Sequence, residues 1–206
     1  MLNRKLIFWE VDTQADFMLP GGKLYVPGAE KLLRNIRKLT DAARQGRVFL
    51  VSHGCYHAPD DPEFKIFPPH CVKGTPGSRY VPEALAEKVA LVPNDATAAL
   101  PSDLSQFQQI LLEKQTLDIF ESRYAEALVS RLPKDAAFVV FGVVTEYCVR
   151  LAAKGLIDRG RRVFLVQDAI ETLKAEDGAR AIAELKDLGA KLITTDGALA
   201  MATKQP

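Results

Sequence analysis

The sequence predicts an α/β fold of three layers, α/β/α, around a mostly parallel central sheet of Rossmann-like type. Short apolar runs alternate along the chain with segments in which apolar residues recur every three or four positions, the spacing of a helix face. Strands that alternate with helices favour a parallel sheet with helices on both sides. The length of 206 residues fits a single domain over residues 1–206.

The first third of the chain contains two expected strands, at residues 6–12 and 48–52, joined by a helix. The helix should occupy residues 29–44 and end at Gly46, because glycine readily adopts the left-handed conformation that terminates helices. A polar stretch at residues 53–79 follows and contains all three histidines. A loop of that length is uncommon in a compact domain unless it is functional, so we expect a long active-site loop there.

The rest of the chain continues the alternation. We expect, in order, helical patches at 83–89 and 104–108, a strand at 110–113, a helix at 121–131, a strand at 138–141, a helix from about residue 145, a strand at 162–167, a helix at 175–188, a strand at 191–194 and a short helix after Asp196. Parallel sheets bind ligands at the carboxyl ends of their strands. Asp12, Lys114 and Cys148 all fall at or just beyond such ends.

These three residues are candidates for an active site. Cys148 would lie in the first turn of its helix, where backbone amides lower the pKa of a thiol and stabilise the thiolate. Each residue also has a simpler interpretation: Asp12 as a turn residue, Lys114 as a solvated lysine and Cys148 as a small core residue. Their joint placement on one sheet edge favours a catalytic role over these structural interpretations.

Composition excludes several classes of protein. Apolar residues make up 48% of the chain and charged residues 26%, which is typical of globular domains. The formal net charge is +1 with dispersed basic residues, so we expect no nucleic-acid partner. No apolar run approaches the roughly 20 residues of a membrane span, and the first residues lack a signal-peptide layout. Three cysteines do not form a disulfide framework, so a cytoplasmic location is expected.

Three segments, in order along the chain, resemble motifs of the isochorismatase-like cysteine hydrolases. They are V-D-T-Q-A-D-F at residues 11–17, E-K-Q-T-L-D-I-F at 113–120 and G-V-V-T-E-Y-C-V at 142–149. A fourth segment, P-P-H-C-V-K-G-T-P-G at 68–77, is most similar to the nicotinamidase branch of that family. The resemblance extends from about Leu6 to Thr195 and implies the isochorismatase-like form of the α/β fold.

The resemblance implies an amidohydrolase that converts nicotinamide into nicotinate and ammonia, a step of NAD salvage. Cys148 would attack the amide carbonyl and form a thioester, while Asp12 would move the proton and Lys114 would stabilise charge. The backbone N–H groups of Val144 and Cys148 would hold the oxyanion, with a cis peptide before Val144.

Phe17 and Phe67 match positions that contact the pyridine ring in nicotinamidases, and flat aromatic side chains select planar substrates. Two alternatives stay open. The chain resembles relatives that hydrolyse other small amides, such as an N-carbamoyl compound or ureidoacrylate. A non-catalytic binding member of the family is the other alternative. Family members often self-associate, so the resemblance leaves a homo-oligomer open, although the sequence itself does not give the oligomeric state.

Nicotinamidases also bind a divalent metal through an Asp-x-His pair and a later histidine. His57 and His70 match the two histidines, whereas Cys55 stands where the aspartate is expected, and Glu63 resembles a fourth ligand of some members. The third ligand could be Cys55, Glu63 or His53. A Cys55 thiolate would favour zinc, and Glu63 would also suit iron or manganese. The lost aspartate leaves open that no metal binds.

Overall fold

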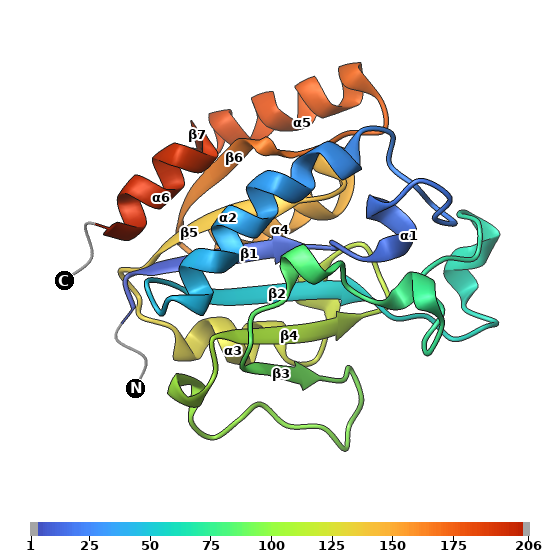
Figure 1. Ribbon diagram of the computed structural model, residues 1–206, viewed down its shortest axis with the longest axis horizontal. Coiled ribbons are helices and arrows are strands. Elements are labelled where there is room, and N and C mark those ends of the chain that lie inside the picture. Colours follow the sequence, from blue (N-terminus) through green and yellow to red (C-terminus); the bar gives the residue numbers. More distant parts are fainter. Residues whose placement is uncertain (1–3, 204–206) are drawn as a thin grey trace.

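The computed structural model describes residues 4–203 and contains a seven-stranded sheet in which every pairing is parallel (Figure 1). In sheet order the strands are β3 (Val89–Val92), β4 (Gln109–Lys114), β2 (Phe49–Cys55), β1 (Leu6–Val11), β5 (Ala137–Gly142), β6 (Arg162–Ile170) and β7 (Lys191–Ile193). The central strand β1 is buried along its whole length, which explains why it is apolar except for Glu10.

Helices cover both faces of the sheet, so the predicted three-layer α/β/α fold is confirmed. One face carries α2 (Leu33–Arg44) and α6 (Thr195–Thr203), and the other carries α3 (Ala125–Arg131), α4 (Arg150–Asp158) and α5 (Ala175–Asp187). Shorter helical turns are α1 (Ala15–Met18), η1 (Ala29–Leu32), η2 (Pro62–Lys65), η3 (Pro76–Ser78), η4 (Pro82–Ala84), η5 (Leu104–Gln106), η6 (Ile119–Glu121) and η7 (Thr145–Val149).

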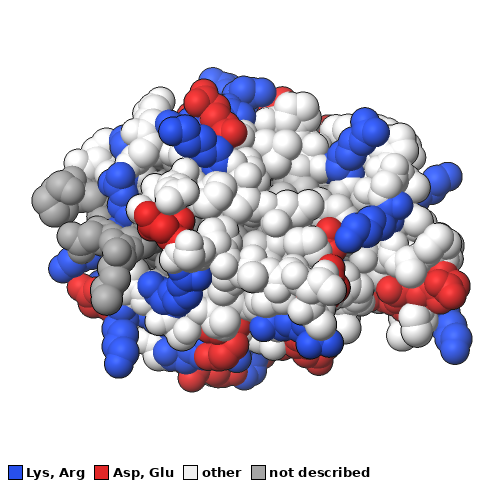
Figure 2. All heavy atoms as spheres, turned by 90° about the horizontal axis from the view of Figure 1, so that it is seen from below, with Lys and Arg blue, Asp and Glu red and all other residues white. Residues whose placement is uncertain are grey.

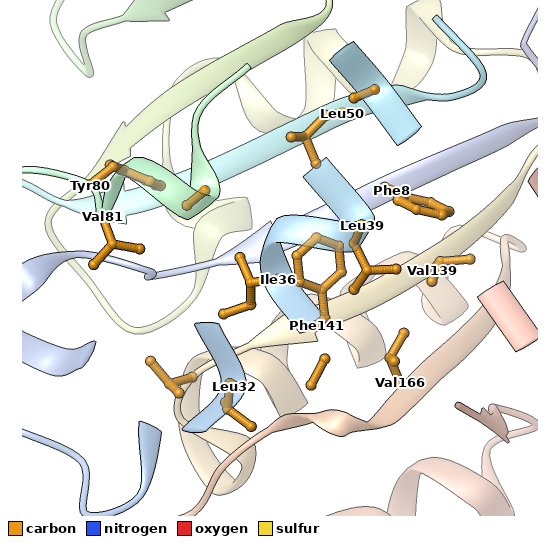
Figure 3. Packing of buried hydrophobic residues seen from close by; sticks show 14 of the residues in the cluster. Phe8, Leu32, Ile36, Leu39, Leu50, Tyr80, Val81, Val139, Phe141 and Val166 are labelled. Carbon is orange, nitrogen blue, oxygen red and sulfur yellow. The ribbon is translucent and has the colours of Figure 1, made fainter. Parts of the chain in front are cut away.

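The helix α2 buries one side against the sheet (Figure 3). Ile36 and Leu39 are fully buried among residues of β1 and β5 that include Phe8 and Phe141. These two residues belong to the three- and four-residue repeat that predicts the helix. The helix ends as expected, because Gly46 adopts a φ of +69° and its N–H bonds back to the carbonyl of Ala43.

Several elements differ from the sequence-based expectations. The region expected to be helical at 83–89 forms the turn η4 and then leads into β3, a half-exposed edge strand that pairs only with β4. The helix expected from residue 121 begins at Ala125, after η6. The strand expected to end at Asp168 continues to Ile170, because a register shift brings Ile170 beside Gly142 of β5.

The long loop begins later than expected, because β2 runs to Cys55. The loop lies with α1 at the edge to which the strand arrowheads point (Figure 1). Its two arms pair where the N–H of His57 donates to the carbonyl of Cys71 (3.1 Å) and the N–H of Lys73 donates to that of His57 (2.9 Å).

Two side chains of the D-x-Q-x-D-F segment hold this loop. The Gln14 amide donates to the carbonyls of Cys55 (2.6 Å) and Ser78 (2.8 Å) and accepts from the Cys55 N–H (2.8 Å). Asp16 accepts the N–H of Cys71 at 2.7 Å. A Cβ at Gly77 would lie 2.2 Å from the Asp16 carboxyl, so glycine is required for this approach. The motif therefore positions the loop as well as Asp12.

Acidic and basic side chains are interspersed over the face of the molecule that Figure 2 shows. Within residues 4–203, no helix has the length and apolar character needed to cross a membrane.

A buried polar network links three strands on the α2 side of the sheet. Glu10 of β1 accepts hydrogen bonds from the Ser52 hydroxyl of β2 (2.6 Å) and the Gln109 amide of β4 (3.3 Å). Gln109 also donates to Ser52 at 2.7 Å. Burial raises the pKa of Glu10 to about 8, although the hydrogen bond from Ser52 acts in the opposite direction. Glu10 is therefore protonated at neutral pH.

We expect Glu10 to make the free energy of unfolding fall as the pH rises from 4.5, the ordinary pKa of glutamate, to about 8. Over that interval the folded state keeps a proton that the unfolded chain has lost, so each pH unit removes up to about 1.4 kcal/mol. Glu10→Gln should remove this contribution to the pH dependence of the free energy of unfolding. Glu87→Gln, at an exposed position, should leave the pH dependence unchanged. Urea unfolding at several pH values measures both, and equal slopes for Glu10→Gln and the parent protein would contradict the prediction.

Candidate active site

The end of β1 places Asp12 at the carboxyl edge of the sheet. Asp12 has a φ of +49°, and its N–H donates to the carbonyl of His53 at 2.9 Å, which turns the chain out of the line of the strand. Beside it, Gly142 ends β5 with a φ of +115°, and a Cβ there would lie 2.1 Å from the carbonyl oxygen of Val11. Glycine permits this close approach, which brings the segment carrying Cys148 against the end of β1.

Lys114, the last residue of β4, lies between Asp12 and Cys148. Its Nζ is 3.1 Å from Asp12 Oδ2 and 3.5 Å from Cys148 Sγ. The exposed fraction is 1% for Asp12, 1% for Lys114 and 6% for Cys148. The structure therefore brings the three candidate residues together in one buried group at the edge where they were expected.

Burial and neighbouring charges set the protonation of this group. Burial raises the pKa of Asp12, but the Lys114 charge and the contact with His53 more than offset it and lower the pKa to about 2. Burial lowers the pKa of Lys114, yet Asp12 and Cys148 raise it well above its usual value. The pair is thus a carboxylate and an ammonium. Burial lowers the pKa of His53 despite the nearby Asp12, so this imidazole is neutral.

Cys148 lies in the π-helical turn η7, ahead of α4, rather than in the first turn of a regular helix. Burial and the Asp12 charge raise the pKa of its thiol well above the usual value, with Lys114 acting in the opposite direction. The expectation of a lowered thiol pKa is therefore wrong for the resting site. Burial and the adjacent carboxylate outweigh the helix-terminal amides, so the thiol needs a base.

Backbone contacts fix the segment that leads to Cys148. The peptide between Val143 and Val144 is cis, as the resemblance implies. The carbonyl of Val144 accepts the N–H groups of Tyr147 and Val149, both at 3.1 Å. Thr145 donates its N–H (2.8 Å) and its hydroxyl (2.7 Å) to the carbonyl of Glu171 beyond β6. The turn is thus tied to a segment more than twenty residues away in sequence.

A narrow, mostly apolar cavity reaches Asp12 and Cys148. Its apolar walls include Phe17, Leu24, Phe67, Leu117, Tyr147 and Leu173. Among the described residues, no arginine or lysine belongs to this lining. The Phe17 ring lies 5.2 Å from the ring of His70, and the Phe67 ring lies 6.1 Å from that of Tyr147. Both predicted aromatic residues therefore face the cavity, together with Tyr147 and three leucines that the sequence analysis missed.

Three buried side chains gather at one side of the cavity. Cys55, His57 and His70 each offer a ligand atom, and these atoms lie within 4.8 Å of one another. The set fits a metal ion, because a thiolate and two imidazoles are common ligands of divalent metals. Cys55 Sγ also accepts a hydrogen bond from Lys114 Nζ at 2.9 Å. Burial and Asp12 raise the pKa of the Cys55 thiol to about 12, so it is neutral at rest.

Neighbouring oxygens orient the two imidazoles. His70 Nδ1 lies 2.8 Å from the carbonyl of Pro68, and His57 Nδ1 lies 3.0 Å from Asp61 Oδ2. Both arrangements leave Nε2 for a ligand, as is typical of metal-binding histidines. Glu63 Oε1 is 3.9 Å from His70 Nε2. The sequence analysis missed Asp61, although its position four residues after His57 could have indicated it.

Comparisons with known proteins identify the family of the chain. The model of the Isochorismatase domain family matches residues 6–197 of the chain. The chain belongs to the isochorismatase family. The nicotinamidase/pyrazinamidase of Mycobacterium tuberculosis is 26% identical over 192 residues, which cover 89% of this chain and 95% of that protein.

Solved structures share the fold of this isochorismatase-like hydrolase. Pyrazinamidase of Pyrococcus horikoshii, determined in complex with zinc, superposes with a TM-score of 0.72 at 26% identity and covers 92% of this chain and 99% of its own. N-carbamoylsarcosine amidase of Thermoplasma acidophilum gives a TM-score of 0.71 at 24% identity, with coverages of 93% and 97%. At 24% identity, the similarity to N-carbamoylsarcosine amidase concerns the fold alone.

We expect Lys114→Met to lower the stability of this isochorismatase-family fold by about 3–5 kcal/mol, because it leaves the Asp12 charge buried without its partner. Asp12→Asn in the same chain should recover much of that loss by removing the charge. Urea unfolding of the two single variants and the double variant gives their coupling energy. Losses that simply add would show that Asp12 and Lys114 do not act as a pair.

Proposed function

We propose that the protein is a cysteine amidohydrolase of the nicotinamidase type, which converts nicotinamide into nicotinate and ammonia. The observation that carries the proposal is the meeting of three groups beside one apolar cavity. The Cys148 nucleophile and the Asp12 carboxylate line the cavity, and the Lys114 ammonium contacts both. Cys148 Sγ and Asp12 Oδ2 both lie within 3.5 Å of Lys114 Nζ. A non-catalytic binding protein has no need for three such groups beside one cavity.

Asp12 acts first as the base. Asp12 and Cys148 both contact Lys114, and the Asp12 charge acts on the Cys148 thiol, so this carboxylate is the base at hand for the thiol proton. Because the resting thiol is neutral, its proton moves to Asp12 as the sulfur attacks the amide carbonyl. Lys114 stabilises the negative charge as this charge passes from the Asp12 carboxylate to the Cys148 sulfur and the amide carbonyl.

The remaining steps use the same residues. The N–H groups of Val144 and Cys148 donate to the oxyanion of the tetrahedral intermediate. Asp12 returns its proton to the nitrogen, the carbon–nitrogen bond breaks, and ammonia leaves a thioester on Cys148. Water then gives a proton to Asp12 and adds its hydroxyl to the thioester carbon. The carboxylic acid leaves as the Cys148 thiol is restored.

The cavity supports a planar, uncharged amide as substrate. Phe17 and Phe67 offer aromatic faces and edges to a ring, and the other walls of the cavity are mostly apolar, as in sites for small molecules. An N-carbamoyl amino acid or ureidoacrylate carries a carboxylate, which needs a cationic partner once it leaves water. The described lining contains no arginine or lysine, and Lys114 is already paired with Asp12, so the cavity favours the neutral aromatic amide over these acids.

We also propose that Cys55, His57 and His70 hold a zinc ion, with Glu63 close enough to join them. The thiolate softens the ligand set and favours zinc over manganese, whereas Glu63 also suits iron. Such an ion, when bound, supplies a Lewis acid for a ring nitrogen or for water. Asp61 and the carbonyl of Pro68 keep His57 and His70 turned toward the site.

Cys148→Ala should lower ammonia release from nicotinamide by at least about a thousandfold, and Asp12→Asn nearly as much, because residues that act as a unit do not have additive effects. Cys71→Ala is the matched control, since Cys71 is also buried but lies outside the cavity lining. Ammonia release from nicotinamide, benzamide, acetamide and an N-carbamoyl amino acid identifies the substrate. Residual turnover by Cys148→Ala would end the covalent mechanism, and preference for the N-carbamoyl acid would end the substrate proposal.

Protein purified without chelators should contain about one equivalent of zinc. His57→Ala and Cys55→Ala should lose it, whereas Cys55→Asp should keep a metal and take up more manganese or iron, because a carboxylate is a harder ligand than a thiolate. Elemental analysis measures the metal content of the parent protein and the three variants, and this measurement does not depend on activity. A metal content near zero in the parent protein, or one unchanged in His57→Ala, would contradict the site.

A further inference from the structure

His53 is a buried polar residue directly behind the catalytic carboxylate. It lies on β2, where it pairs with Val11 of β1 and Leu112 of β4. Its side chain has an exposed fraction of 0%, and its ring lies 6.1 Å from that of Trp9. Neither ring nitrogen has a hydrogen-bond partner among residues 4–203. A buried imidazole left in that state is costly, so the residue needs an explanation.

His53 faces the Asp12 oxygen that Lys114 does not hold. Lys114 Nζ lies 3.1 Å from Asp12 Oδ2, while His53 Nδ1 lies 3.6 Å from Asp12 Oδ1. A separation of 3.6 Å is too long for a hydrogen bond, but a shift of about half an ångström would form one. Catalytic hydrogen bonds are often long in empty sites and shorten when substrate binds. The two unsatisfied groups therefore face each other across a closable gap.

His53 is not placed to serve the metal site. The ligand atoms of Cys55, His57 and His70 form one group, and His53 is outside it. The role of third ligand that the sequence left open for His53 is thus better met by Cys55. The ring instead contacts the Asp12 carboxylate, with the charges of Lys114 and Asp118 also acting on it.

We propose that His53 positions Asp12 for catalysis by donating its Nδ1–H to Asp12 Oδ1 when substrate is bound. The inference rests on the proposed amidohydrolase function. Lys114 alone holds one oxygen, so the carboxylate can still rotate about its last side-chain bond. A second donor on the other oxygen fixes its plane. That matters because Asp12 must receive the Cys148 proton and return it to nitrogen, and such transfers are sensitive to small misplacements.

The side-chain geometry gives a matched pair of variants for the test. Asparagine at position 53 can place its amide N–H close to the place of the imidazole Nδ1, whereas glutamine places its amide near Nε2. His53→Leu keeps bulk without any donor. We expect His53→Leu to lower kcat for nicotinamide by about 10- to 100-fold with KM changed less than about threefold. His53→Asn should recover most of kcat, while His53→Gln should stay close to His53→Leu.

A second measurement needs no amide substrate. Alkylation of Cys148 by iodoacetamide at fixed pH, followed by peptide mapping, reports how readily Asp12 takes the thiol proton. His53→Leu should slow it several-fold, and His53→Asn should restore it. Zinc content should match the parent protein in all three His53 variants, and thermal melting identifies any that fail to fold.

The outcomes separate this inference from the proposed function. Parent-like kcat and alkylation in folded His53→Leu, or His53→Asn no better than His53→Leu, would overturn the positioning role. Loss of zinc from folded His53→Leu would also overturn it and assign the residue to the metal. A parent protein that hydrolyses no amide, yet shows the expected order of alkylation rates, would contradict the function and leave the positioning of Asp12 supported.

Discussion

The buried ion pair between Asp12 and Lys114 is the interaction on which the rest of the active edge depends. Neither charge reaches water, so each is retained only because the other is present. The pair joins the end of β1 to the end of β4 across the intervening strand β2. Cys55, at the end of β2, fills the space between and accepts a hydrogen bond from the same ammonium. A few residues earlier in these strands, Glu10, Ser52 and Gln109 link the same three strands on the α2 side of the sheet.

Much of the fold could be predicted from the sequence, because buried parallel strands read as apolar runs and their ends collect at one edge. That rule placed Asp12 and Lys114 correctly. It failed for β3, whose four residues are half exposed and owe their conformation to pairing with β4. It also ended β2 too early at Ser52, because the strand continues through polar residues that are buried beside the site.

The chemistry of the site was less predictable than its location. The raised pKa of the Cys148 thiol results from burial and from a carboxylate far away in sequence, which no local pattern reveals. The π-helical turn around Cys148 likewise depends on Thr145 bonding to Glu171 beyond β6. His53 could be recognised as a neighbour of Asp12 only once the register of β1 and β2 was known.

Gln14 holds both ends of the long loop, at Cys55 and at Ser78, from a position two residues after Asp12. The loop segment between these anchors carries Glu63, Phe67 and His70, which line the cavity. Asp12, Lys114 and Cys148 lie outside this segment of the sequence. Part of the cavity wall thus lies on a different segment of the chain from the proposed reacting groups, although Phe17 belongs to the same motif as Asp12. Mutations within the loop can accumulate and select a new molecule while the reacting groups stay where they are, so a single scaffold can diversify its substrates without rebuilding its chemistry.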